Sequence, residues 1–237
     1  MGNQMEHKSE GVCRFCLKKF SGAGMGRHLS ACKTRKDKNA LELKTGRKKY
    51  KIFHIKISEY KYYWLHIEIP ARATLYDLDE FLRGIWLECC GHMSSFTIRG
   101  EKYDDERLLD EFSSWDMPSQ SMNNRLYTVL HVKDAFSYEY DFGSTTFLDG
   151  NVLAVREGYL GKNKIRILAR NNPYIFECGQ CGKTATNTCL ECEDFVCDQC
   201  LDLHECGDEM MLDVVNSPRM GVCGYGGPDR VDDWTPK

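Results

Sequence analysis

Two stretches of alternating residues, KIFHIKI at 51–57 and YWLHIEI at 63–69, decide the fold of the central part of this chain. In both, apolar residues alternate with polar ones. Because the side chains of a strand point to its two faces in turn, this period of two predicts two strands. A short turn at 58–61 separates them, so we expect a hairpin.

The residues after the hairpin predict a helix that covers it. Thr74 and Asp77 form a capping-box signal, and apolar residues follow at helical spacing until Gly91. Later patterns predict a strand around Phe96 and Ile98, a helix at 105–115, and strands at 126–132, 138–142, 152–155 and 165–168. Residues 51–172 are therefore expected to form an α+β domain, and its opening strand–strand–helix order resembles the β-grasp of ubiquitin-like folds.

Composition places the chain among globular proteins. Its 42% hydrophobic and 28% charged residues exclude wholesale disorder. No apolar run approaches the roughly 18 residues that a membrane span needs, and residues 1–11 lack the apolar stretch of a signal peptide. We expect a cytoplasmic protein that does not bind membranes.

The thirteen cysteines favour metal binding over disulfides, since no secretory signal is present. The first motif, Cys13-x2-Cys16-x11-His28-x3-Cys32, predicts one zinc site. His28 and Cys32 are four residues apart and so project from one face of a helix. Residues 1–34 resemble a classical two-Cys, two-His zinc finger in which Cys32 replaces the last His.

Charge is divided as unevenly as the cysteines. Residues 1–56 contain 15 Lys or Arg against 4 Asp or Glu, a net of +11, and the remaining 17 against 31 give −14. This asymmetry suggests a polyanionic partner for the basic end, or attraction to the protein's own acidic body. Residues 35–50 are predicted to be a basic linker.

The basic end is expected to contact nucleic acid. The base-reading positions of the classical finger fall on Ser21, Gly24 and Arg27, of which only Arg27 has reach, so contact with phosphates is expected more than sequence reading. The residues predicted to make these contacts are Arg27, Lys33, Arg35, Lys36, Arg47, Lys48 and Lys49. A finger used for protein contact is the alternative.

Residues 173–237 form a cysteine-rich module with the strongest signal in the chain. The motif is Cys178-x2-Cys181-x7-Cys189-x2-Cys192-x4-Cys197-x2-Cys200-x3-His204-x-Cys206. Its short x4 gap favours an interleaved cross-brace over sequential fingers. We assign Cys178, Cys181, Cys197 and Cys200 to one zinc ion, and Cys189, Cys192, His204 and Cys206 to another.

The spacing of these ligands resembles B-box and related treble-type modules, which usually bind proteins. Closed four-ligand sites leave no position for water, so the zinc is expected to be structural. Cys223 is an alternative to Cys206 as the last ligand, or a free thiol. Cys89 and Cys90 are predicted to be small buried thiols and are not assigned as ligands.

Residues 50–170 resemble the plasmid Ri open-reading-frame-three-like family, which is carried by plasmids, transposons and many prokaryotic chromosomes. The resemblance rests on the hairpin, on Thr74-Leu75-x-Asp77-Leu78, on Trp86 followed by His92-Met93-x-x-Phe96, and on Tyr138-x-Tyr140-Asp141-Phe142-Gly143. It implies a protein of prokaryotic or mobile-element type and assigns no activity.

The sequence thus predicts a non-enzymatic protein with three zinc ions. Its basic finger and linker are expected to contact nucleic acid, and its acidic body and cross-brace to contact protein. A pure protein-interaction adaptor is the competing class, and an enzyme with a site near His92 and Asp141 is a third.

Overall fold

The computed structural model describes residues 9–44, 46–60, 62–106, 119–161 and 165–228. They divide into two compact units. The first unit contains the described residues of Met1–Phe81 and Met93–Asn172, and the second those of Leu82–His92 and Pro173–Val231. The predicted finger, linker and central domain therefore belong to one unit, whereas residues 82–92 belong with the cysteine-rich module.

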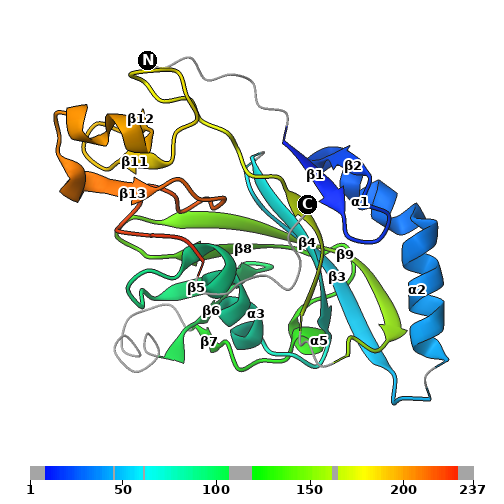
Figure 1. The fold of residues 1–237 in the computed structure, drawn as a ribbon. Helices are drawn as coiled ribbons and strands as arrows, with labels where there is room; N and C mark the ends of the chain where they lie inside the picture. Colours follow the sequence, from blue (N-terminus) through cyan, green and yellow to red (C-terminus); the bar gives the residue numbers. More distant parts are fainter. Residues whose placement is uncertain (1–8, 45, 61, 107–118, 162–164, 229–237) are drawn as a thin grey trace. The chain divides into compact units, whose positions relative to one another are not determined.

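A ten-stranded sheet dominates the first unit (Figure 1). Its order is β2-β1-β10-β4-β3-β9-β8-β5-β6-β7, and every neighbouring pair is antiparallel except β6 with β7. The strands are β1 Glu10–Cys13, β2 Lys19–Ser21, β3 Tyr50–Glu59, β4 Tyr63–Pro70, β5 Ser94–Ile98, β6 Glu101–Asp104, β7 Gln120–Ser121, β8 Ala135–Tyr140, β9 Thr146–Gly158 and β10 Arg166–Asn171. The predicted α+β class is confirmed, and the β-grasp arrangement stays a prediction.

The predicted hairpin is confirmed as β3 and β4, which lie inside the sheet. Ile55 pairs with Ile67, and both are fully buried. The opposite face of the hairpin is also buried, although it carries polar residues: His54 is 5% exposed, and His66 and Glu68 are 0% exposed. This face is therefore covered by other elements, which must supply hydrogen bonds and charges.

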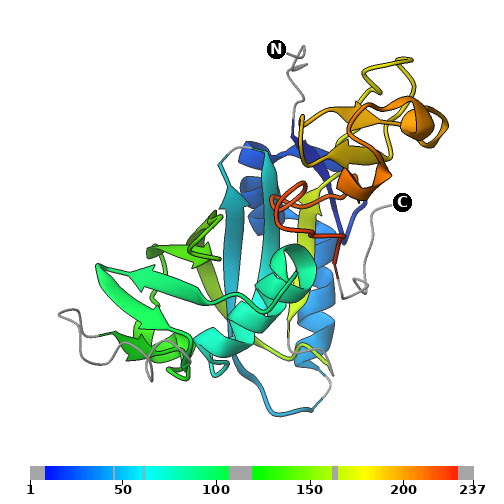
Figure 2. The same cartoon turned by 90° about the vertical axis from the view of Figure 1, so that its left-hand side faces the viewer.

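Helices cover both faces of the central strands. The capping box of α3, Leu75–Leu82, is confirmed, because Thr74 and Asp77 exchange backbone-to-side-chain hydrogen bonds. Asp79 of α3 accepts a hydrogen bond from Tyr138 on the Ile55 side of the sheet. The other face is covered by α1, Gly22–Ala31, and α2, Lys33–Leu43. Figure 2 shows α3 in front of the central strands and the two blue helices behind them.

Two predicted elements turn out differently, and a third is not tested. Residues 33–43 form α2, so much of the predicted linker is helical. The strand predicted at 126–132 is wrong: Leu126–Val129 form the short helix α5, because the buried Leu126, Val129 and Leu130 follow helical spacing. The helix predicted at 105–115 lies largely outside the described residues.

The second unit contains a three-stranded sheet of order β12-β11-β13. Its strands are β11 Asn187–Cys189, β12 Phe195–Val196 and β13 Met211–Asp213. Residues 83–87 form a π-helical turn whose Trp86 is fully buried, and the Trp86 carbonyl accepts a hydrogen bond from Ser217. In neither unit does a described helix have the length and apolar character needed to cross a membrane.

Candidate metal centres

The N-terminal ligands come together on β1, its following turn and α1. Cys13 ends β1, His28 lies on α1, and Cys32 caps that helix. With Cys16, their ligand atoms all lie within 4.8 Å of one another. The distance from Cys16 Sγ to His28 Nε2 is 3.3 Å, close to the roughly 3.6 Å that tetrahedral zinc–sulfur and zinc–nitrogen bonds impose. The group can hold one zinc ion.

The cysteine-rich module brings together two further groups. One contains Cys178, Cys181, Cys197 and Cys200, and the other Cys189, Cys192, His204 and Cys206. Within them, Cys181 Sγ lies 3.6 Å from Cys197 Sγ, and Cys192 Sγ lies 3.4 Å from His204 Nε2. Both groups are interleaved along the chain, in the arrangement that the spacing predicts.

Three Cys-x2-Cys segments, which begin at Cys13, Cys178 and Cys189, fold into the same turn. In each, the amide four residues after the first cysteine donates to that cysteine's carbonyl, and the cysteine amide donates to the carbonyl five residues on. The residue four positions after the first cysteine has a positive φ in all three turns: Leu17 at 59°, Gly182 at 70° and Glu193 at 61°. Side chains other than glycine pay about 1–2 kcal/mol there. Leu17 and Glu193 accept that cost, so the same turn recurs even where no glycine is present.

The leading thiols of the module are prepared for metal binding. Burial raises the pKa of the Cys178 thiol, but backbone hydrogen bonds at Cys197, Gln180 and Cys181 outweigh it and lower the pKa to about 6. The same balance lowers the pKa of Cys189 to about 7. Within the same two groups, hydrogen bonds with neighbouring thiols raise the pKa of Cys200, and burial with neighbouring thiols raises that of Cys206. The backbone donors therefore favour the thiolate, which is the form that binds metal, at Cys178 and Cys189 first.

A fourth group, which was not predicted from the sequence, contains Cys89, Cys90, His92 and Cys223. Cys223 is separated from the other three by more than 130 residues along the chain, so local spacing could not reveal the group. One signal was available: the three predicted sites use ten of the thirteen cysteines and leave these three. The structure therefore gathers four groups, where three zinc ions were predicted.

The finger is part of the ten-stranded sheet, because β1 pairs with β10. Its helix α1 also lies close to β4. A Cβ added to Gly22 would stand 2.6 Å from the Trp64 indole nitrogen, and one added to Gly26 would stand 3.3 Å from His66 Cε1. These glycines thus allow α1 to approach the sheet, and one edge of the predicted reading helix is occupied by the protein itself.

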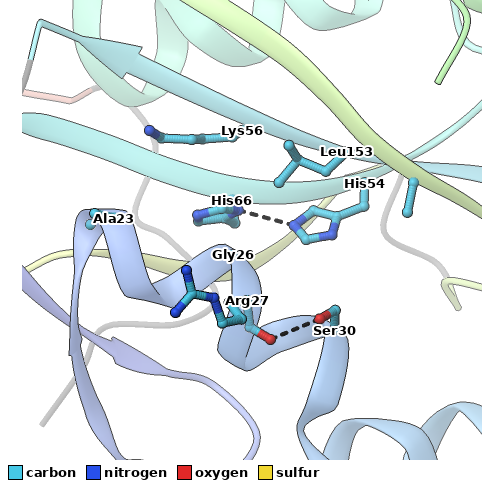
Figure 3. Close-up of a pocket in the computed structure, with 10 residues that line it drawn as sticks. Ala23, Gly26, Arg27, Ser30, His54, Lys56, His66 and Leu153 are labelled. Carbon is cyan, nitrogen blue, oxygen red and sulfur yellow. Dashed lines mark hydrogen bonds between the residues drawn. The ribbon is translucent and has the colours of Figure 1, made fainter. Parts of the chain in front are cut away.

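A cavity of about 320 Å³ lies between α1 and the sheet (Figure 3). Arg27 lines it from α1, Lys56 from β3, and His54 and His66 from its floor. His54 Nε2 lies 3.0 Å from His66 Nδ1. Burial lowers the pKa of His54 to about 3, and burial together with the neighbouring His54 lowers that of His66 well below its usual value. The pair is therefore neutral at physiological pH.

The residues predicted to contact nucleic acid fall into two classes. Arg35 is buried, and its Nη2 donates to Glu68 Oε1 at 2.8 Å, so it belongs to the interior rather than to a binding surface. The other residues are exposed: Arg27 on α1, Lys33 and Lys36 on α2, and Arg47, Lys48 and Lys49 before β3. Of the three predicted reading positions, Ser21 is used as the N-cap of α1, where it accepts a hydrogen bond from the Gly24 amide.

The two residues considered for catalysis have other contacts. Asp141 is 6% exposed and has a positive φ of 65°, and its side chain accepts a hydrogen bond from the Gly143 amide. This is the geometry of an Asx turn at the end of β8. His92 Nε2 lies 3.3 Å from Cys223 Sγ in the fourth cysteine group. The two residues belong to different units of the chain.

Comparisons with known proteins give partial similarities. No family model matches the chain. A 97-residue segment, 41% of this chain, is 29% identical to Protein wech of Drosophila melanogaster and spans 12% of that protein's length. A solved protein of unknown function from Methanosarcina mazei Go1 is similar over 49% of this chain and 67% of its own, with a TM-score of 0.42 and 19% identity. Neither similarity establishes a family, and the resemblance to the plasmid Ri family stays a prediction.

Proposed function

We propose that this chain is a non-enzymatic zinc-binding protein that contacts the phosphate backbone of nucleic acid with its exposed N-terminal cations. The observation that carries the proposal is the charge of the surface between residues 18 and 51. Among the described residues of this stretch, Asp37 is the only exposed acid. Eleven exposed cations accompany it: Lys18, Lys19, Arg27, Lys33, Lys36, Lys38, Lys44, Arg47, Lys48, Lys49 and Lys51.

Two carboxylates beside this surface are already engaged by arginines. Glu42 on α2 and Glu68 on β4 are paired with the guanidinium groups of Arg156 and Arg166, and Glu68 also with Arg35. Because these carboxylates already pair with arginines, they are not expected to pair with the exposed lysines as well. The adaptor alternative, in which the acidic body holds the basic segment, would need carboxylates other than these two.

Contact with phosphates is favoured over base reading. The α1 edge that carries Gly22 and Gly26 lies against the sheet, and Ser21 is used as a helix cap. Arg27 alone combines exposure with reach at the three reading positions. A surface of lysines with one such arginine binds through charge, which is largely independent of sequence.

The ligand sets support a structural role for zinc. Each group offers four cysteine or histidine ligands, and a tetrahedral ion with four protein ligands has no position left for a water or a substrate. Hydrolysis by these centres is therefore disfavoured. We assign to the zinc ions the role of fixing the finger and the second unit in their folded forms.

The experiment is fluorescence anisotropy of labelled 20-base duplex and single-stranded DNA, titrated with the full zinc-loaded chain at several salt concentrations. If about 5 phosphates are neutralised, log affinity should fall against log salt with a slope of about −4 to −5 on duplex DNA. Replacing Lys48 and Lys49 together by Ala should make the slope shallower by up to about 2.

The matched control replaces two exposed lysines outside this surface, Lys102 and Lys133, by Ala. It removes the same charge and should leave the slope unchanged. Equal effects of the two double variants would mean that net charge, and not this surface, drives binding. No binding to any duplex or single strand at low salt would overturn the proposal.

Protein contact by the second unit is a companion proposal. Leu203, next to the ligand His204, is 73% exposed, and Ile175 is 64% exposed. Pulldowns from a native host after nuclease treatment should recover a protein partner with the wild type and lose it with Leu203→Asp. Recovery that disappears with nuclease alone would assign the interaction to nucleic acid.

A further inference from the structure

We infer that Cys89, Cys90, His92 and Cys223 form a fourth structural zinc site, within the second unit. Their ligand atoms all lie within 4.8 Å of one another. Cys90 Sγ lies 3.9 Å from Cys223 Sγ, and His92 Nε2 lies 3.3 Å from Cys223 Sγ. Around a tetrahedral zinc ion, two sulfur ligands lie about 3.8 Å apart, and a sulfur and a nitrogen ligand about 3.6 Å apart. The observed distances are therefore close to those between the corners of a zinc coordination tetrahedron.

The backbone is shaped to bring these ligands together. Cys223 has a φ of 50°, a left-handed conformation that costs a residue with a side chain about 1–2 kcal/mol. Gly91, between Cys90 and His92, has a φ of 73°, and a Cβ there would meet nothing within 4 Å, so its glycine serves the backbone conformation rather than close packing. Strain of this kind persists where something compensates it, and a metal ion would do so.

Charge around the site suits three thiolates. Zinc with three cysteine thiolates and one neutral histidine carries a net charge of −1. Arg219 is fully buried, and its Nη2 lies 3.6 Å from Cys89 Sγ. The guanidinium group beside this sulfur offsets the negative charge of the loaded site.

A disulfide does not explain the group. The 3.9 Å between Cys90 Sγ and Cys223 Sγ is far above the roughly 2.05 Å of a sulfur–sulfur bond. A bond between these two would also leave the thiol of Cys89 and the ring of His92 converging without a purpose. A metal ion uses all four.

The fourth zinc would join segments far apart in the chain. The π-helical turn at 83–87 leads into three of the ligands, and Ser217 and Arg219 lie on the segment that leads to the fourth. The ion thus fixes residues 89–92 to Cys223, as a covalent cross-link would. With this site, all thirteen cysteines of the chain are zinc ligands, together with three histidines.

The first test is native mass spectrometry of the full chain purified without chelator. The wild type should carry four zinc ions and Cys223→Ser three. Because the same site is affected, Cys89→Ser with Cys90→Ser should also carry three, and combining all three substitutions should still leave three. Val222→Ser, a neighbouring change outside the ligand set, should keep four. If Cys223→Ser loses an ion while the Cys89 and Cys90 double variant keeps four, Cys223 belongs to another site and the inference fails.

The second test uses the wild type and so does not depend on variants that fold. Cys90 and Cys223 are exposed, and as free thiols they would react quickly with N-ethylmaleimide. With zinc bound, peptide mapping should show both protected, together with Cys89, and all three should become reactive at the same time after chelation. Rapid alkylation of Cys90 and Cys223 in the zinc-loaded protein would overturn the site.

Discussion

Replacing Glu68 by Gln should destabilise the first unit by about 3 kcal/mol, because three arginines converge on this single carboxylate. Arg35 donates to Oε1 at 2.8 Å, Arg156 to Oε2 at 2.7 Å, and Arg166 Nη1 lies 3.4 Å from Oε2. Glu68 itself is fully buried on β4. The amide keeps the shape of the side chain and removes the charge that the arginines share.

The magnitude follows from the pKa of Glu68. Burial raises this pKa, but the hydrogen bonds and charge of Arg156, and then those of Arg35, outweigh burial and lower it from 4.5 to about 2. At about 1.4 kcal/mol per pH unit, the protein favours the charged carboxylate by about 3 kcal/mol. Breaking a buried ion pair typically costs about 3–5 kcal/mol, which agrees.

The assay is urea unfolding of zinc-loaded protein at pH 7, with Glu157→Gln as the control. Glu157 is an exposed neighbour on β9, and its substitution should cost less than about 0.5 kcal/mol. Because the folded-state pKa is lowered, the contribution of Glu68 is present above pH 4.5 and is lost as pH falls toward 2. Glu68→Gln should lack this part of the acid sensitivity. A variant as stable as the wild type at pH 7 would refute the reasoning.

Two further predictions concern α1 and the sheet beneath it. Gly22→Ala should destabilise the first unit by more than 1 kcal/mol in urea unfolding, because its Cβ would meet the buried Trp64 indole at 2.6 Å. Gly24→Ala, whose nearest neighbour is Ser21 Oγ at 3.3 Å, should be neutral or stabilise by up to about 1 kcal/mol through helix propensity, and equal losses in both would contradict the close approach of α1. Since burial lowers the pKa of His54 from 6.5 to about 3, its contribution to stability is full above pH 6.5 and falls by about 1.4 kcal/mol per pH unit below it. His54→Gln should therefore lose less stability than the wild type between pH 7 and 5.5. Any loss of zinc in acid should affect both proteins equally. The same pH dependence in both would mean that His54 is not held neutral in the folded protein.

Local patterns predicted the parts of the fold that depend on local residues. The period of two gave β3 and β4, and the capping box placed the start of α3, because both depend on neighbours in sequence. The alternation of apolar and polar residues could not show that the polar face of the hairpin is buried. That burial depends on α2, whose inward positions Arg35 and Glu42 are charged rather than apolar and pair with interior charges from distant strands. A charged stretch was therefore expected to be a linker, where the structure has a packed helix.

The same division holds for the metal centres. Three groups draw all their ligands from about 30 residues or fewer, so Cys-x2-Cys spacing was enough to propose them. The fourth combines residues 89–92 with Cys223, and no spacing rule covers that separation. Counting the cysteines left over is the signal that sequence alone offers for such a site.

We propose that zinc is held in closed sites of protein ligands, and X-ray absorption at the zinc K-edge of the full chain measures those ligands. Thirteen sulfur and three nitrogen ligands over four ions predict four-coordinate zinc with between three and four sulfur neighbours per ion. The sulfur shell should lie at about 2.3 Å and the smaller nitrogen shell at about 2.0–2.1 Å, with no oxygen neighbour. Fewer than three sulfur neighbours per ion, or an oxygen atom bound to zinc, would mean that the sites are not closed by these protein ligands.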